Sequence, residues 1–87
     1  MANHAQALKR HRQSEKRRAA NNFFKATMRT SLKKARAALA TKDASAAAPL
    51  VRDTCAYVDH IAGKGVIPKA RASRLKSRLM GQLAALG

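Results

Sequence analysis

Acidic residues are scarce in this 87-residue chain, which has four Asp and Glu against 19 Lys and Arg and a formal net charge of +15. Calcium or magnesium sites and paired-carboxylate catalysis need carboxylates that the chain hardly has. The length leaves room for one small domain, which we expect to span residues 1–87. Because repulsion among like charges destabilises a compact fold, the charge favours a polyanionic partner.

Cysteine and aromatic residues are also few: one Cys, one Tyr, two Phe and no Trp. Cys55 alone can form neither an intrachain disulfide nor a thiolate metal cluster. The aromatic side chains are too few for a platform that stacks single-stranded bases. His4, His11 and His60 share no ligand spacing. We therefore expect no enzyme, no metal, no cofactor and no small-molecule substrate.

Long apolar runs are missing too. None approaches the roughly 18 residues of a membrane span. The basic N-terminus lacks the apolar region of a signal peptide. We expect a cytoplasmic protein with no membrane partner.

The positive charge is concentrated at the two ends of the chain. Residues 1–36 carry +10, residues 37–63 carry −1 and residues 64–87 carry +6. A near-neutral middle between two basic ends indicates that the middle packs while the ends face the partner.

Apolar residues recur every three or four positions, and the alternation typical of strands is missing, so we expect an all-α fold. Three apolar stripes are predicted, namely Phe24, Met28, Leu32, Ala35 and Leu39, then Ala47, Leu50, Thr54, Tyr57, Val58 and Ile61, then Ala72, Leu75, Leu79, Leu83 and Leu86. Basic rows run beside two of them, Lys25, Arg29, Lys33 and Arg36 in the first and Arg71, Arg74 and Arg78 in the third. Each helix thus has a packing face, and two have a cationic face.

Helix-breaking residues divide the stripes. Asp43 is a good N-cap for the second helix. Pro49 leaves two alternatives open: it kinks that helix, or it moves the start of the helix to Ala48, with Pro49 at the first position, where proline is tolerated. Either Gly63 or Gly65 can end the helix in the left-handed conformation, and Pro68 suits the first turn of the third helix.

Residues 1–23 have basic side chains on nearly every side and no apolar stripe. Such a segment is a solvated helix, a disordered arm, or a helix completed by a partner. Phe23 lies off the first stripe and is the better candidate for stacking on a base. Tyr57 is expected in the core, and Cys55 beside it.

Three groups of motifs span the whole chain. They are Met1-Ala2-Asn3, Lys9-Arg10, Gln13-Ser14-Glu15-Lys16-Arg17-Arg18 and Asn21, then Met28-Arg29-Thr30 and Lys33-Lys34, then Ala62-Gly63-Lys64-Gly65-Val66-Ile67 with Lys69, Arg71-Ala72, Arg74 and Lys76-Ser77-Arg78-Leu79. In these residues the chain resembles the bacterial small-subunit ribosomal protein S20 family. It departs at Pro68-Lys69-Ala70, where the family usually has His-Lys-Asn, and at Phe23-Phe24, where small, polar or basic residues are common.

The resemblance implies a three-helix bundle with a long first helix, bound to small-subunit rRNA early in assembly. Residues 1–23 would be a basic RNA-binding extension of helix 1, and residues 24–87 the bundle. The expected function is that of a structural constituent of the small ribosomal subunit, which binds folded rRNA through its phosphate backbone, stabilises its assembly and lies near other small-subunit components. The expected RNA-binding residues are Lys9, Arg10, Arg12, Ser14, Lys16, Arg17, Arg18, Asn21, Lys25, Arg29, Lys33, Lys34, Arg36, Lys64, Lys69, Arg71, Arg74, Lys76, Ser77 and Arg78.

Charge, alanine content and size also fit a nucleoid-type DNA-compacting protein, which is the alternative function. A cationic membrane-active peptide needs a wide apolar stripe opposite its basic face, and residues 1–23 lack one.

Overall fold

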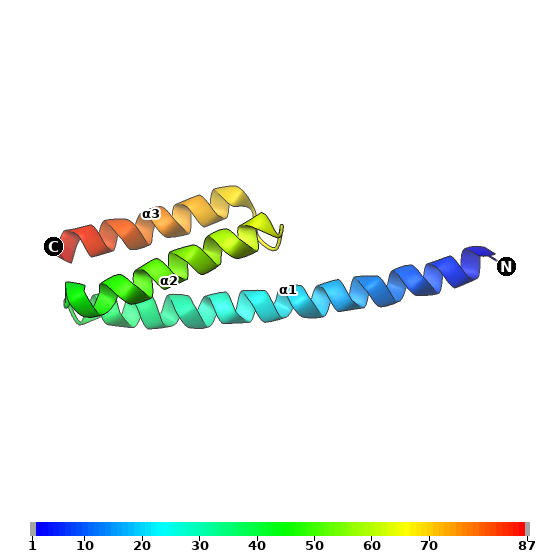
Figure 1. The fold of residues 1–87 in the computed structure, drawn as a ribbon, viewed down its shortest axis with the longest axis horizontal. Coiled ribbons are helices and arrows are strands. Elements are labelled where there is room, and N and C mark those ends of the chain that lie inside the picture. The colour runs from blue at the N-terminus through cyan, green and yellow to red at the C-terminus, as the bar shows by residue number, and fades with distance from the viewer. Residues whose placement is uncertain (1, 87) are drawn as a thin grey trace.

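The computed structural model describes the backbone of residues 2–86 and the side chains of residues 4–86. They form three helices, α1 (Ala2–Ala40), α2 (Ala44–Gly63) and α3 (Lys69–Leu86), with no strand within this range (Figure 1). Met1 and Gly87, the ends of the expected domain, lie outside the described residues. The predicted all-α fold with a long first helix is confirmed.

α1 is 39 residues long, about twice the length of α2 or α3. α2 folds back along the C-terminal half of α1 and lies between α1 and α3, while the N-terminal half of α1 projects alone (Figure 1). The described chain is therefore elongated, with dimensions of 65 × 20 × 13 Å. Only the C-terminal half of α1 has helices to pack against.

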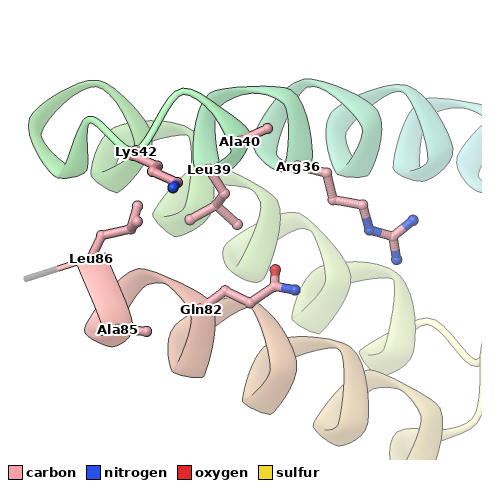
Figure 2. A pocket seen from close by; sticks show the side chains of 7 residues that line it. All are labelled: Arg36, Leu39, Ala40, Lys42, Gln82, Ala85 and Leu86. Carbon is pink, nitrogen blue, oxygen red and sulfur yellow. The ribbon is translucent and has the colours of Figure 1, made fainter.

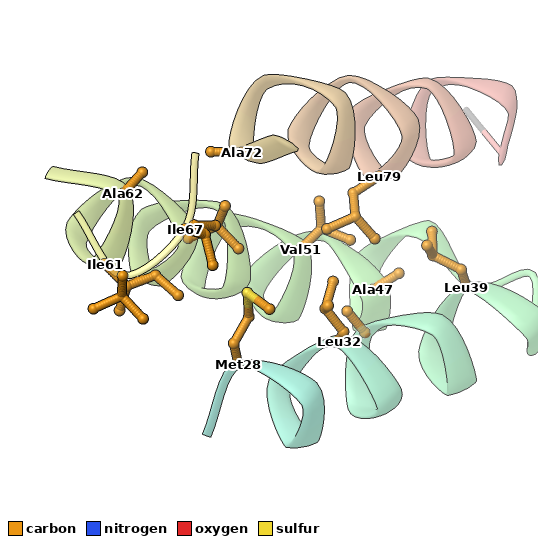
Figure 3. Packing of buried hydrophobic residues seen from close by; sticks show 13 residues of the cluster. Met28, Leu32, Leu39, Ala47, Val51, Ile61, Ala62, Ile67, Ala72 and Leu79 are labelled. Carbon is orange, nitrogen blue, oxygen red and sulfur yellow. The ribbon is translucent and has the colours of Figure 1, made fainter. Parts of the chain in front are cut away.

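The core lies where the three helices meet (Figure 3). Its buried apolar residues are Met28, Leu32, Ala35 and Leu39 of α1, Ala47, Val51, Val58, Ile61 and Ala62 of α2, Val66 and Ile67 of the connection, and Ala72 and Leu79 of α3. Phe24, Tyr57, Leu75, Leu83 and Leu86 are partly buried against this cluster. The predicted stripes of α1 and α3 are confirmed.

The predicted stripe of α2 is wrong at one position. Leu50 is 36% exposed, whereas its neighbour Val51 is completely buried. Leu50 and Val51 lie on either side of the buried row that runs through Ala47 and Val58 along the helix. Val51 points toward Leu79 of α3 (Figure 3), so the packing of α3 on α2 selects the Val51 side.

The start of α2 excludes one of the two alternatives for Pro49. Asp43 is the N-cap, and its side chain accepts hydrogen bonds from the backbone N–H groups of Ser45 and Ala46. The helix begins at Ala44 with Pro49 inside it, so the alternative start at Ala48 is wrong. Pro49 cannot donate to the Ser45 carbonyl oxygen, but both residues are exposed and water can bond that oxygen.

α2 ends with a hydrogen-bonded turn of the Schellman type. The Gly65 N–H donates to the Ala62 carbonyl oxygen, and the Val66 N–H donates to the Ile61 carbonyl oxygen. The nitrogen–oxygen distance is 3.0 Å in both hydrogen bonds. Gly65 has φ 79°, so it is Gly65 rather than Gly63 that takes the left-handed conformation. Pro68 directly precedes α3 and is not in its first turn, contrary to the prediction. Its carbonyl oxygen accepts a hydrogen bond from the Ala72 N–H, with a nitrogen–oxygen distance of 3.1 Å.

Candidate nucleic-acid interface

The projecting half of α1 carries the densest positive charge. All described side chains from residue 4 to residue 23 are exposed. The helix turns by about 100° per residue, so consecutive basic residues point in different directions. The expected RNA-binding residues placed here are Lys9, Arg10, Arg12, Ser14, Lys16, Arg17, Arg18 and Asn21. This segment, residues 4–23, is called the arm below.

Glu15 is the single acidic residue among residues 1–36. Its Oε1 atom lies 3.0 Å from Nε2 of His11, one turn earlier. Because both side chains are largely exposed, water screens this pair and it contributes little to stability. The arm therefore presents cationic groups with very little compensating charge.

The packed half of α1 continues the basic surface beside the core. Arg29, Lys33, Lys34 and Arg36 are exposed, and Lys25 is half-buried. Lys25, Arg29, Lys33 and Arg36 each come one position after a residue of the apolar stripe, so they lie at the edge of the buried face. Lys34 comes two positions after Leu32 and lies on the outer side of the helix. α1 thus carries one cationic surface along most of its length.

A second cationic surface lies on α3, separated from α1 by α2 (Figure 1). Arg71, Arg74 and Arg78 are exposed and, with Leu75, line a shallow hollow of about 290 Å³. Spacings of three and four residues place the three guanidinium groups on one face of the helix. Within the described residues none of the three pairs with an acidic side chain. This arrangement suits a ligand with several negative charges.

Two further expected residues of α3 differ in their surroundings. Ser77 is exposed. Lys76 is half-buried, and its Nζ atom lies 2.9 Å from both Oδ1 and Oδ2 of Asp59 on α2. Lys76 therefore joins α3 to α2, and its charge is partly neutralised.

Cys55 lies close to this ion pair and is half-buried against the core. Burial raises the pKa of the Cys55 thiol, and the charge of Asp59 acts in the same direction, while that of Lys76 opposes it. The thiol is consequently a poor nucleophile at neutral pH.

Lys64 is exposed at the end of α2, and Lys69 is exposed at the start of α3. The Lys64 Nζ atom lies 5.2 Å from the centroid of the Phe24 ring, within the range of a cation–π interaction. The Phe24 ring meets that of Phe23 in an edge-to-face arrangement, with 5.9 Å between centroids. The connection is thereby fixed where the arm leaves the bundle.

Lys42 lies at the opposite end of the bundle, in the break predicted between the first two helices, but its conformation was not predicted. A hollow of about 460 Å³ lies between α1 and α3 at this end (Figure 2). It is lined by Arg36, Leu39, Ala40, Lys42, Gln82, Ala85 and Leu86. Lys42 has φ 60°, the left-handed conformation that non-glycine residues rarely adopt. The neighbouring helix end at Ala40 was the available signal, because a residue just past a helix C-terminus commonly takes this conformation.

The described residues contain neither a metal site nor a membrane-spanning helix. No group of three or more His, Cys, Asp or Glu side chains is placed to hold a metal ion. None of the helices is both long enough and apolar enough to cross a membrane.

Comparison with known proteins gives full-length matches. The family profile described as Ribosomal protein S20 matches residues 2–84. The chain is 44% identical over 87 residues to the small ribosomal subunit protein bS20 of Nitrosomonas eutropha, covering 100% of both chains. It is 43% identical over 86 residues to that of Dechloromonas aromatica, covering 99% of this chain and 97% of the relative. It is 44% identical over 87 residues to that of Trichlorobacter lovleyi, covering 100% of both. The matches include both the arm and the packed helices.

Proposed function

Because the chain belongs to the ribosomal protein S20 family, we propose that it binds folded small-subunit rRNA directly through the phosphate backbone and thereby stabilises assembly of the subunit. Family membership makes it a structural constituent of the small ribosomal subunit and not an enzyme, as expected from the sequence. Its place of action is then the ribosome in the cytoplasm, with other small-subunit components as neighbours.

The observation that carries the proposal is the exposure of every described arm side chain around a helix that packs on nothing. A helix with basic residues on all sides can enter a space between RNA segments and neutralise phosphates in several directions. A guanidinium group can donate two hydrogen bonds to the oxygens of one phosphate, whereas an ammonium group acts as a mobile point charge. Folded RNA exposes phosphates and 2′-hydroxyl groups more readily than base edges, so such an arm recognises the shape and the backbone of the RNA.

The bundle gives this binding a fixed geometry. α2 packs on both α1 and α3, so it sets the separation between the arm and the arginines of α3 (Figure 1). Two RNA elements bound at these surfaces are held at that separation, which is an assembly function. The division into an RNA-binding extension (residues 1–23) and a bundle (residues 24–87) belongs to this proposal.

The proposed contact residues are those expected from the sequence, with Lys76 moved to a structural role by its ion pair with Asp59. The DNA-compacting alternative is based only on charge, alanine content and size, and the family match does not support it.

The test is competition of folded small-subunit rRNA against duplex DNA for the full chain at one fixed salt concentration. We expect rRNA to displace DNA, whereas equal competition would favour the alternative. Arg74→Gln, which removes one charge from the arginine face of α3, should bind rRNA more weakly. Arg52→Gln is the matched control, because Arg52 is exposed on α2 and lies outside the proposed surface. Equal loss in both variants would show that only net charge matters.

A further inference from the structure

Phe23 is exposed in a way that the proposed phosphate contacts do not explain. Its side chain is 68% exposed, more than Leu8 and Met80 at 49% each. It is one of three aromatic residues in the chain. An isolated exposed apolar residue needs no special explanation, but the position and the fixation of this ring distinguish Phe23.

Phe23 faces away from the bundle. It precedes Leu32, which is 6% exposed, by nine residues. Nine residues are about two and a half helical turns, so the two side chains point in opposite directions. No described helix packs on the outer side of α1 (Figure 1), so this ring is not part of the core.

The outer side of α1 has basic residues on either side of Phe23. Lys16 lies seven residues before it and Lys34 eleven residues after it, about two and three turns away on the same side of the helix. Between them lie small side chains, including Ala19, Ala26 and Thr27. The Thr27 hydroxyl donates a hydrogen bond to the Phe23 carbonyl oxygen at a distance of 3.0 Å, so this hydroxyl is already bonded within the helix. The ring therefore protrudes from an uncharged stretch between cationic groups.

The ring is also held in place from one side. The rings of Phe23 and Phe24 meet edge to face, with an angle of 70° between their planes. Phe24 is itself fixed by the core and by Lys64. Edge-to-face contact leaves at least one face of the Phe23 ring open. A fixed aromatic ring with an open face is a stacking surface for another flat ring, and little conformational entropy is lost on stacking.

We propose that Phe23 stacks on an unpaired base of the bound rRNA while Lys16 and Lys34 contact phosphates on either side of it. The inference rests on the proposed function, because it takes the bound polyanion to be RNA. The cationic surroundings fit a nucleotide better than an apolar protein surface, and unpaired bases are the RNA groups that aromatic side chains stack on. Phe23 adds a contact that depends on an unstacked base rather than on backbone shape.

The experiment measures rRNA affinity of full-length variants at several salt concentrations. Phe23→Ala should weaken binding by roughly 5- to 150-fold, the range for loss of one base–aromatic stack. Its salt dependence should match that of the wild type, because no phosphate contact is removed. Lys16→Ala should instead reduce the salt slope by about one. Met80→Ala is the control for loss of an exposed apolar side chain and should bind within about twofold of the wild type.

Phe23→Trp supplies an independent signal, because the natural chain has no Trp. Stacking should keep its affinity close to the wild type and quench its fluorescence when rRNA binds. Wild-type affinity for Phe23→Ala, or an enhanced and blue-shifted Trp emission on binding, would overturn the stacking inference while leaving the proposed function intact. Absence of rRNA binding by the wild type itself would overturn both.

Discussion

Lys76 Nζ lies 2.9 Å from each carboxylate oxygen of Asp59, so a single cation of α3 is bonded to both oxygens of a residue on α2. The two side chains are 38% and 56% exposed, so solvent screens their attraction. The contact makes Lys76 part of the bundle, unlike Arg74, which lies near it in the sequence.

Lys76→Ala should therefore lower the free energy of unfolding by no more than about 1 kcal/mol and change rRNA affinity by less than about twofold. Arg74→Ala should leave the melting temperature unchanged but weaken rRNA binding, and it should reduce the slope of log affinity against log salt by about one. Thermal unfolding and binding titrations of the two variants check this. A larger affinity loss in Lys76→Ala than in Arg74→Ala would place Lys76 on the RNA.

Lys42→Gly should stabilise the protein. Lys42 has φ 60°, which costs a residue with a Cβ atom about 1–2 kcal/mol. Glycine avoids that cost but loses more chain entropy on folding, so the expected net gain is about 0.5–1 kcal/mol. Lys42→Ala is the control, because it removes the same charge and keeps the unfavourable φ. The explanation fails if Ala stabilises as much as Gly in chemical denaturation.

Asp43 should make the bundle sensitive to acid. The Ser45 hydroxyl, together with the backbone N–H groups of Ala46 and Ser45, lowers the pKa of Asp43 from its ordinary value. A group whose pKa is lower in the folded state stabilises that state above its unfolded pKa of about 3.9. That stabilisation is lost as the pH falls through the lower folded value.

The comparison variant is Asp43→Asn, which can cap the helix equally well but does not titrate. Between pH 7 and pH 2 the Tm of the wild type should fall further than that of Asp43→Asn. Parallel Tm curves would mean that the Asp43 carboxylate contributes nothing through its charge.

Much of the fold follows from local sequence. The stripe through Met28 and Leu32 and the cap at Asp43 depend on neighbouring residues, and both occur as predicted. The side of α2 that is buried depends on helices distant in sequence. Periodicity could not separate Leu50 from Val51, because α3 decides which of them is covered. Pro49 was undecidable for a related reason: its tolerance depends on Ser45 being exposed to water.

The candidate interface divides in the same way. The basic residues of the arm and the arginines Arg71, Arg74 and Arg78 of α3 are exposed as their spacing implied. The ion pair of Lys76 depends on where α3 places it against α2, which no local pattern specifies. The left-handed conformation of Lys42 was not predicted, because glycine or asparagine rather than lysine is expected to adopt it after a helix.

The arm should exchange its amide hydrogens faster than the packed half of α1. Arg12 and Lys16 are one turn apart and repel each other, and no core contact supports the helix there. Bound phosphates remove that repulsion, so rRNA should slow exchange across residues 4–22 by roughly tenfold or more while changing residues 28–39 little. Hydrogen exchange read out by mass spectrometry measures both segments together. Equal protection of the two segments without RNA would contradict the prediction.

The direct test of phosphate-backbone binding is the salt dependence of affinity for small-subunit rRNA. Each phosphate that the protein neutralises releases condensed counterions, so affinity falls with salt in proportion to the number of contacts. If about six to ten basic side chains meet phosphates, affinity should fall by roughly 10³–10⁵ between 50 and 200 mM salt. A change of less than about threefold over that range would contradict the account, because so few counterions would be released that the basic surfaces could not be the binding surfaces.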